Sequence, residues 1–293
     1  MATLRDIKTR IRSVREIQKI TAAMKMVAVA KLRKAQIRQE EYEAFRVPVA
    51  ELFFWLAPEV RNRDHGLLCP RREEKIWIIV LTSDRGLCGA YNHNIIKETE
   101  EFIADLPRGR EIKLLISGRK GMNYFRRRDY AHLDLDLPED IGYRSRVVSE
   151  LITGAYMESR TDRVYLVADR FRLDRESGVR VNSLLPISAD TGEDEKEDSS
   201  RRRIEARRKM YRYQLEPGLG CNVDYLSRLY LHSLVHRLFL DSEAAEQFTR
   251  MKAMELATGN ADDLIFELTL SYNKARQETI TAELIDIMGG VQA

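Results

Sequence analysis

The stretch ELTLSYNKARQETITAELIDIMGG, residues 267–290, predicts a long helix with an unusual distribution of apolar side chains. It holds no glycine or proline before Gly289 and Gly290, where we expect the helix to stop. Its apolar positions form two narrow stripes at 4 and 3 residue spacing: Leu268, Tyr272, Ala275, Thr279 and Ala282, and then Ile280, Leu284 and Ile287. Narrow stripes on a polar helix favour pairing with a second long helix over burial in a globular core.

The opposite end of the chain offers such a helix, since residues 2–36 contain neither glycine nor proline. Its apolar positions form two runs at 3 and 4 spacing: Leu4, Ile7, Ile11 and Val14, then Ile17, Ile20, Met24 and Val27. The step from Val14 to Ile17 is three residues where a heptad repeat needs four, which predicts a stammer that overwinds the helix pair. The two ends therefore predict an antiparallel coiled coil.

The middle of the chain alternates between strand and helix patterns. Residues 76–81 form an entirely apolar run, which is typical of a buried parallel strand. Further elements are expected at 91–105 (helix), 111–117 (strand), 122–128 (helix), 147–157 (helix), 163–169 (strand) and 209–217 (strand). Such alternation predicts an open α/β sheet.

The expected fold class is therefore α+β with an α/β core: a long antiparallel coiled coil of the N- and C-terminal helices and a central Rossmann-like α/β domain. The predicted domains are residues 1–57, 72–217 and 222–289. The last helix, expected from 223 to 288, would be on the order of 100 Å long, so another subunit must surround part of it. Within the central domain, residues 188–209 join an acidic block to a basic block, which indicates a solvated loop or a docking surface.

Three patterns could carry chemistry. SDRGLCGAYNHN (83–94) follows a strand and precedes a helix, but it lacks the third glycine of a dinucleotide-binding turn, so a tight turn is favoured. His232 and His236 have the spacing of zinc ligands, but no third ligand is evident and packing is favoured. Cys69, Cys88 and Cys221 share no metal-like spacing and indicate reduced thiols. We therefore predict no catalytic, cofactor-binding or metal-binding residues.

Two long segments and one turn together resemble the gamma subunit of F-type ATP synthase. They are IRSVREIQKITAAMKMVAVAKLRKAQ (11–36), VLTSDRGLCGAYN (80–92) and MKAMELATGNADDLIFELTLSYNKARQETITAELIDIMGG (251–290). The resemblance implies a non-catalytic rotor shaft inside a hexamer of alpha and beta subunits, with the epsilon subunit and the membrane rotor ring at its foot. It implies a peripheral position on the cytoplasmic face of the plasma (inner) membrane, and no cofactor. It also implies partner contacts at Lys25, Met26, Arg276, Gln277 and Thr281.

The charge of the N-terminal helix admits another interpretation. Residues 1–38 hold eleven Lys and Arg against Asp6 and Glu16, as a nucleic-acid-binding arm would. No aromatic residue for base stacking precedes Tyr42, which favours a basic shaft in an oligomer and no nucleic acid. A nucleotide-binding α/β enzyme with helical arms and a nucleic-acid-binding coiled-coil protein remain the alternatives. No apolar run approaches 18 residues, and the start of the chain lacks the apolar core of a signal peptide, so we expect neither a membrane span nor a presequence.

Overall fold

The computed structural model of the chain describes the backbone over most of its length. The described residues are 4–57, 66–128, 130–135, 137–138, 140–171, 178–187, 216 and 218–291, without the side chains of 283 and 285–291. The charged loop 188–209 and nearly all of the expected strand 209–217 lie outside them. The chain divides into two compact units, which we call unit 1 (Met1–Ala30 and Thr249–Ala293) and unit 2 (Lys31–Phe248).

Two long helices contribute to both units. Helix α1 spans Leu4–Leu56, with Pro48 inside it, and helix α6 spans Leu219–Val291. The expected stop at Gly289 and Gly290 is wrong, because α6 continues through both glycines. Glycine lowers helix propensity by only about 1 kcal/mol relative to alanine, so it does not by itself end a helix. No helix in the described part of the chain is both long enough and apolar enough to cross a membrane.

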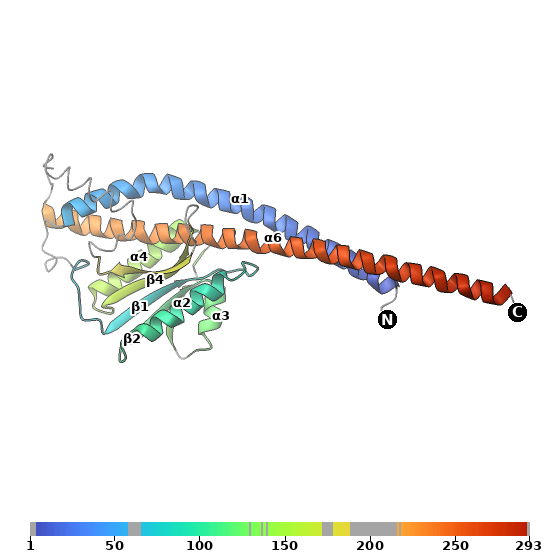
Figure 1. Cartoon of the computed structure of the whole chain (residues 1–293). Helices are drawn as coiled ribbons and strands as arrows, with labels where there is room; N and C mark the ends of the chain where they lie inside the picture. Colours follow the sequence, from blue (N-terminus) through green and yellow to red (C-terminus); the bar gives the residue numbers. More distant parts are fainter. Residues whose placement is uncertain are drawn as a thin grey trace. The chain divides into compact units, whose positions relative to one another are not determined.

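Unit 2 is built around a five-stranded sheet (Figure 1). Its strands are β1 (Lys75–Leu81), β2 (Glu111–Ser117), β3 (Ala131–Leu135), β4 (Arg163–Arg170) and β5 (Gly178–Leu185). They lie in the order β3-β2-β1-β4-β5, and every pairing is parallel except β4 with β5. The three strands predicted from apolar runs are confirmed. The edge strands β3 and β5 were missed, because partly exposed strands lack a continuous apolar run.

Helices cover both faces of this sheet (Figure 1). They are α2 (Tyr91–Asp105), α3 (Arg119–Phe125) and α4 (Ile141–Met157). Trp77, Ile79 and Leu81 belong to an apolar core cluster that also includes residues of α4 and of the parts of α1 and α6 that lie in unit 2. On the other face, Phe102 of α2 packs edge-on against Tyr165 of β4 with ring centroids 4.9 Å apart. The sheet is thus the middle layer of a three-layer core.

In the part of α1 that belongs to unit 1, the buried positions differ from the two predicted apolar runs. Leu4, Ile7, Ile11 and Val14 are partly or fully buried, as expected, and the inward series then continues through Gln18, Thr21, Lys25 and Ala28. Ile17, Ile20 and Val27 are each more than half exposed, and of the second predicted run only Met24 is partly buried. The predicted stammer is therefore wrong. An unbroken 4 and 3 spacing needs no overwinding of the helix.

Polar side chains connect α1 to α6 along this inward series. Gln18 Nε2 donates to Asp262 Oδ1, Thr258 Oγ1 donates to Thr21 Oγ1 at 2.9 Å, and Lys25 Nζ lies 2.7 Å from Glu255 Oε1. Positions rise along α1 as they fall along α6, so the two helices run in opposite directions within unit 1. The half-buried polar side chains Gln18, Thr21 and Lys25 thereby each find a partner on α6.

The matching series on α6 has the same uninterrupted spacing. Its partly or fully buried members are Met254, Thr258, Ala261, Ile265, Leu268, Tyr272 and Ala275. The register of the polar pairs places Leu4, the first described residue, opposite Ala275. Thr279 and Ala282 of the first predicted stripe lie beyond that point and are exposed, as are Ile280 and Leu284 of the second. The first stripe is confirmed only as far as Ala275.

Candidate functional site

The carboxyl ends of β1 and β4 form the place where an open α/β sheet of this kind would bind a ligand. Chain order reverses there, since β2 and β3 lie on one side of β1 and β4 and β5 lie on the other. In such sheets the crevice at this switch point is the usual ligand site. The turn after β1 contains Leu87 and Gly89 with φ of 63° and 56°, so the motif SDRGLCG is a tight turn, as predicted.

The turn after β1 supplies its own hydrogen-bond acceptors to the first amides of α3. Arg119 N donates to Asp84 Oδ1 at 3.1 Å, Lys120 N to the carbonyl oxygen of Ser83 at 3.1 Å, and Gly121 N to Thr82 Oγ1 at 2.9 Å. A phosphate in a nucleotide-binding fold accepts hydrogen bonds from donors of this kind. Here oxygen atoms of the chain itself already accept the hydrogen bonds of these amides.

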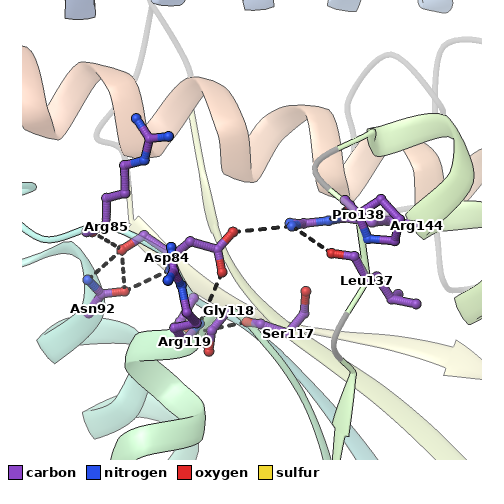
Figure 2. A network of polar contacts seen from close by, with 11 residues as sticks. Asp84, Arg85, Asn92, Ser117, Gly118, Arg119, Leu137, Pro138 and Arg144 are labelled. Atoms are coloured by element: carbon purple, nitrogen blue, oxygen red, sulfur yellow. Dashed lines mark hydrogen bonds and ion pairs between the residues drawn. The ribbon is translucent and has the colours of Figure 1, made fainter.

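The second carboxylate oxygen of Asp84 faces the start of α4, as Figure 2 shows. Arg144 Nη2 lies 3.2 Å from Asp84 Oδ2 and also donates to the carbonyl oxygen of Leu137 at 3.2 Å, and Arg144 Nε donates to the carbonyl oxygen of Pro138. Asp84 is thus shared between α3 and α4. An anion entering this edge would meet a carboxylate that is already paired.

Close packing of backbone leaves little room beside these contacts. Gly118, at φ of 101°, lies so near β1 that an added Cβ would come within 2.0 Å of the Thr82 carbonyl oxygen. A Cβ on Gly121 would lie 2.6 Å from Thr82 Oγ1. Glycine is required at Gly118 by both the positive φ and the missing space. The glycines serve packing between β1 and the start of α3.

Helix α6 covers the β4 side of the same edge. Tyr91, fully buried at the start of α2, shares a 2.7 Å hydrogen bond with Ser242 Oγ, and burial raises its pKa well above the usual value. Phe171, just after β4, packs on Phe248 with ring centroids 5.1 Å apart. The segment 241–248 therefore occupies the position of a ligand at the switch point.

Asp169 is a buried carboxyl at this edge. It belongs to β4, and its Oδ1 atom has no hydrogen-bond partner. Burial raises its pKa to about 6, although a backbone hydrogen bond from Arg170 acts in the opposite direction. At neutral pH the ionised form of Asp169 is therefore destabilised, because burial removes water from its charge.

The histidine pair of α6 has a packing role. His236 Nδ1 lies 2.7 Å from Ser145 Oγ, and its ring packs at a tilt of 43° against Tyr42 with centroids 4.2 Å apart. Burial lowers the pKa of both His232 and His236, which favours the neutral form of each ring. Among the residues that the structure describes, no group of three or more His, Cys, Asp or Glu could hold a metal ion. Cys69, Cys88 and Cys221 are free thiols.

The residues predicted to contact partners all lie in unit 1. Met26 is 67% exposed, while Lys25 is partly buried and paired with Glu255. Arg276, Gln277 and Thr281 are exposed, and the Thr281 hydroxyl donates to the Gln277 carbonyl oxygen of its own helix at 2.8 Å. Sequence reasoning missed Asp84, Arg144 and Tyr91, because the pairs Asp84–Arg144 and Tyr91–Ser242 join residues that lie 60 and 151 positions apart along the chain.

These features define a class: a Rossmann-like sheet whose ligand edge is filled by its own side chains, joined to two long helices. Comparisons with known proteins agree with it. The family model described as ATP synthase matches residues 3–293. The ATP synthase gamma chain of Chloroherpeton thalassium is 37% identical over 302 residues, covering 100% of this chain and 98% of the relative. That of Aquifex aeolicus is 36% identical, covering 99% and 97%.

The chain therefore belongs to the ATP synthase gamma family. Its fold is also that of a chain in the mitochondrial ATP synthase of Euglena gracilis, with a TM-score of 0.63 at 19% identity over 99% of this chain and 93% of that one. A central-stalk structure from Tetrahymena thermophila has a TM-score of 0.56 over 81% of this chain and 99% of its own. A gamma chain is a non-catalytic subunit, as the resemblance implied.

Proposed function

We propose that the chain is the central rotor shaft of an F-type ATP synthase. It couples ion-driven rotation of a membrane ring to conformational cycling of a hexamer of alpha and beta subunits. Its two long helices pair as an antiparallel coiled coil within the axial cavity of that hexamer, while the sheet domain meets the epsilon subunit and the ring. The complex lies at the cytoplasmic face of the plasma membrane, with this chain as a peripheral subunit.

The observation that carries this proposal is the exposure of large apolar side chains on both helices of unit 1. Those more than half exposed include Ile17, Ile20 and Val27 on α1 and Leu256, Phe266 and Leu270 on α6. Exposed apolar residues in such numbers mark a surface that another protein covers. In unit 1, polar pairs connect α1 to α6, and large apolar side chains lie on the outer surface. This arrangement is the one expected of a shaft that partner subunits enclose.

The partner contacts follow from this placement. Met26 offers an exposed thioether, which adapts to successive surfaces without a fixed charge. Arg276, Gln277 and Thr281 form a polar group for a loop of the beta subunit, since Gln277 and Thr281 lie one helical turn apart. Lys25 holds Glu255 within unit 1, and only the exposed part of its side chain is available to a partner.

Reconstitution with purified alpha and beta subunits tests the proposal. Replacing Ile20 and Val27 together by Asn should reduce incorporation into the hexamer, while the circular dichroism of the isolated chain stays unchanged because neither side chain is buried. Replacing the exposed, charged Lys19 by Gln is the control. Incorporation of the Asn variant at the wild-type level would contradict a shaft enclosed by the hexamer.

Nucleotide binding tests one of the two alternatives, the nucleotide-binding α/β enzyme with helical arms. A gamma chain with a filled ligand edge should show no ATP binding in isothermal titration at millimolar nucleotide. Saturable binding to the isolated chain would favour the α/β enzyme with helical arms.

A further inference from the structure

A cluster of buried and half-buried charges lies where α1, α6 and β4 meet within unit 2. At its centre is the carboxylate of Asp241 on α6, whose side chain is 11% exposed. Gln39 of α1 donates to Asp241 Oδ1 at 2.8 Å. The Nε atoms of Arg237 and of Arg170 lie 3.7 and 3.9 Å from Asp241 Oδ2. One carboxylate thus contacts two long helices and a strand of the sheet.

A second carboxylate extends the cluster along α1. Glu43 receives two hydrogen bonds from Arg46, each 2.9 Å long, and Arg46 is itself buried. Arg237 Nε lies 3.6 Å from Glu43 Oε1, so Arg237 stands between the two carboxylates. The ion pairs therefore form a continuous series from α1 through α6 to the end of β4.

Ionic and apolar contacts resist different movements. The apolar cluster between the helices and the sheet resists separation, but apolar attraction is non-directional, so a helix that slides or turns while keeping its area buried meets little opposition. A buried, geometrically specific ion pair loses its compensation when the charges move apart. Such pairs therefore resist shear and rotation of a helix on the sheet.

We infer that this cluster is the joint through which the sheet domain passes torque to the two long helices. We call it the charge joint, and it consists of Gln39, Glu43, Arg46, Arg170, Arg237 and Asp241. The inference rests on the proposed rotor function. Arg170 has a particular place in it, because it is the member that belongs to the sheet.

The first experiment compares two neutral substitutions on α6 in the complete ATP synthase, reconstituted into vesicles. Asp241→Asn removes the central charge, whereas the control Glu243→Gln removes the charge of an ion pair between Glu243 and Arg38, 3.2 Å long, that joins α1 to α6 without the sheet. ATP hydrolysis is measured together with ATP-driven membrane potential. We expect Asp241→Asn to lower the potential generated per ATP hydrolysed severalfold, and Glu243→Gln to leave it unchanged.

A second pair of variants changes Arg170, the member of the cluster that belongs to the sheet. It keeps the proposal testable if the Asp241→Asn chain fails to fold. Arg170→Gln should reproduce the loss of pumping per ATP, and Arg170→Lys, which keeps the positive charge, should restore most of it. Wild-type pumping per ATP in both Asp241→Asn and Arg170→Gln complexes would overturn the joint while leaving the rotor function intact. Failure of the wild-type chain to support pumping would overturn the rotor function itself.

Discussion

Unit 2 has a core of fully buried apolar side chains around its sheet, whereas unit 1 has no such core and leaves many large apolar side chains exposed on two paired helices. In unit 2, Ile78 and Ile79 of β1 are fully buried between two layers of helices. In unit 1, Ile17 and Ile20 face solvent while Gln18 and Lys25 turn toward the neighbouring helix. The same residue type thus has opposite environments in the two units of one chain.

This contrast separates two sources of stability. Burial of apolar area stabilises unit 2 within the chain itself. In unit 1 the buried and half-buried apolar side chains form a single series between two helices, so a partner that covers the exposed apolar side chains adds to the stability of these helices.

Identical substitutions in the two units should have unequal effects on the isolated chain. Ile79→Ala should lower the free energy of unfolding by about 2–5 kcal/mol, because it leaves a cavity beside the sheet. Ile20→Ala should change it by less than about 0.5 kcal/mol, because the side chain is already exposed. Urea unfolding followed by far-ultraviolet circular dichroism measures both, because Trp55 and Trp77 lie in unit 2 and their fluorescence would not report on unit 1. Equal destabilisation would mean that Ile20 is buried within the isolated chain.

Simultaneous replacement of Arg276, Gln277 and Thr281 by Ala should weaken binding to the hexamer by about tenfold, equivalent to 1.4 kcal/mol. Alanine favours the helix, so this loss cannot come from unwinding of α6. Binding is measured with purified alpha and beta subunits, and thermal unfolding of unit 2 serves as the control. Unchanged binding would show that these residues make no partner contact.

Asp169→Asn should stabilise unit 2 by about 1 kcal/mol at pH 7.5, after allowance for partial solvent screening. The pKa of Asp169 is raised from 3.8 to about 6, so the folded state binds the extra proton between these values and wild-type stability falls as pH rises through this window. The asparagine does not titrate. Urea unfolding at pH 4 and pH 7.5 should therefore show a higher free energy of unfolding for the variant than for the wild type only at the higher pH.

Met26→Lys should impair coupling slightly more than hydrolysis in the assembled complex. A new ion pair with a carboxylate of the beta subunit would add at most about 1 kcal/mol if exposed, and so would slow the shaft modestly at each contact. Met26→Leu is the control, since it keeps an apolar side chain of similar size. Normal pumping per ATP in the Lys variant would show that Met26 does not face the rotating interface.

Sequence patterns predicted the bounds of the strands and helices of unit 2 well. They were less successful at predicting which side chains of unit 1 face the neighbouring helix. The bounds of β2 and α2 were predicted to the residue, because an apolar run and an amphipathic stretch are local signals. The inward positions of α1 were misassigned after Val14, because the pattern was followed by hydrophobicity alone. Gln18 and Lys25 face α6 because Asp262 and Glu255 satisfy their polar groups there.

The sequence by itself determined the two helical ends, the buried strands and the tight turn after β1, since each depends on residues adjacent in the chain. Only the tertiary structure decided the strand order, the filling of the ligand edge by α6 and the charge joint. Gln39, Arg170 and Asp241 lie far apart in sequence, and nothing local indicates that they meet. Local propensity fixes what a segment becomes, whereas burial and pairing depend on which surfaces the fold brings together.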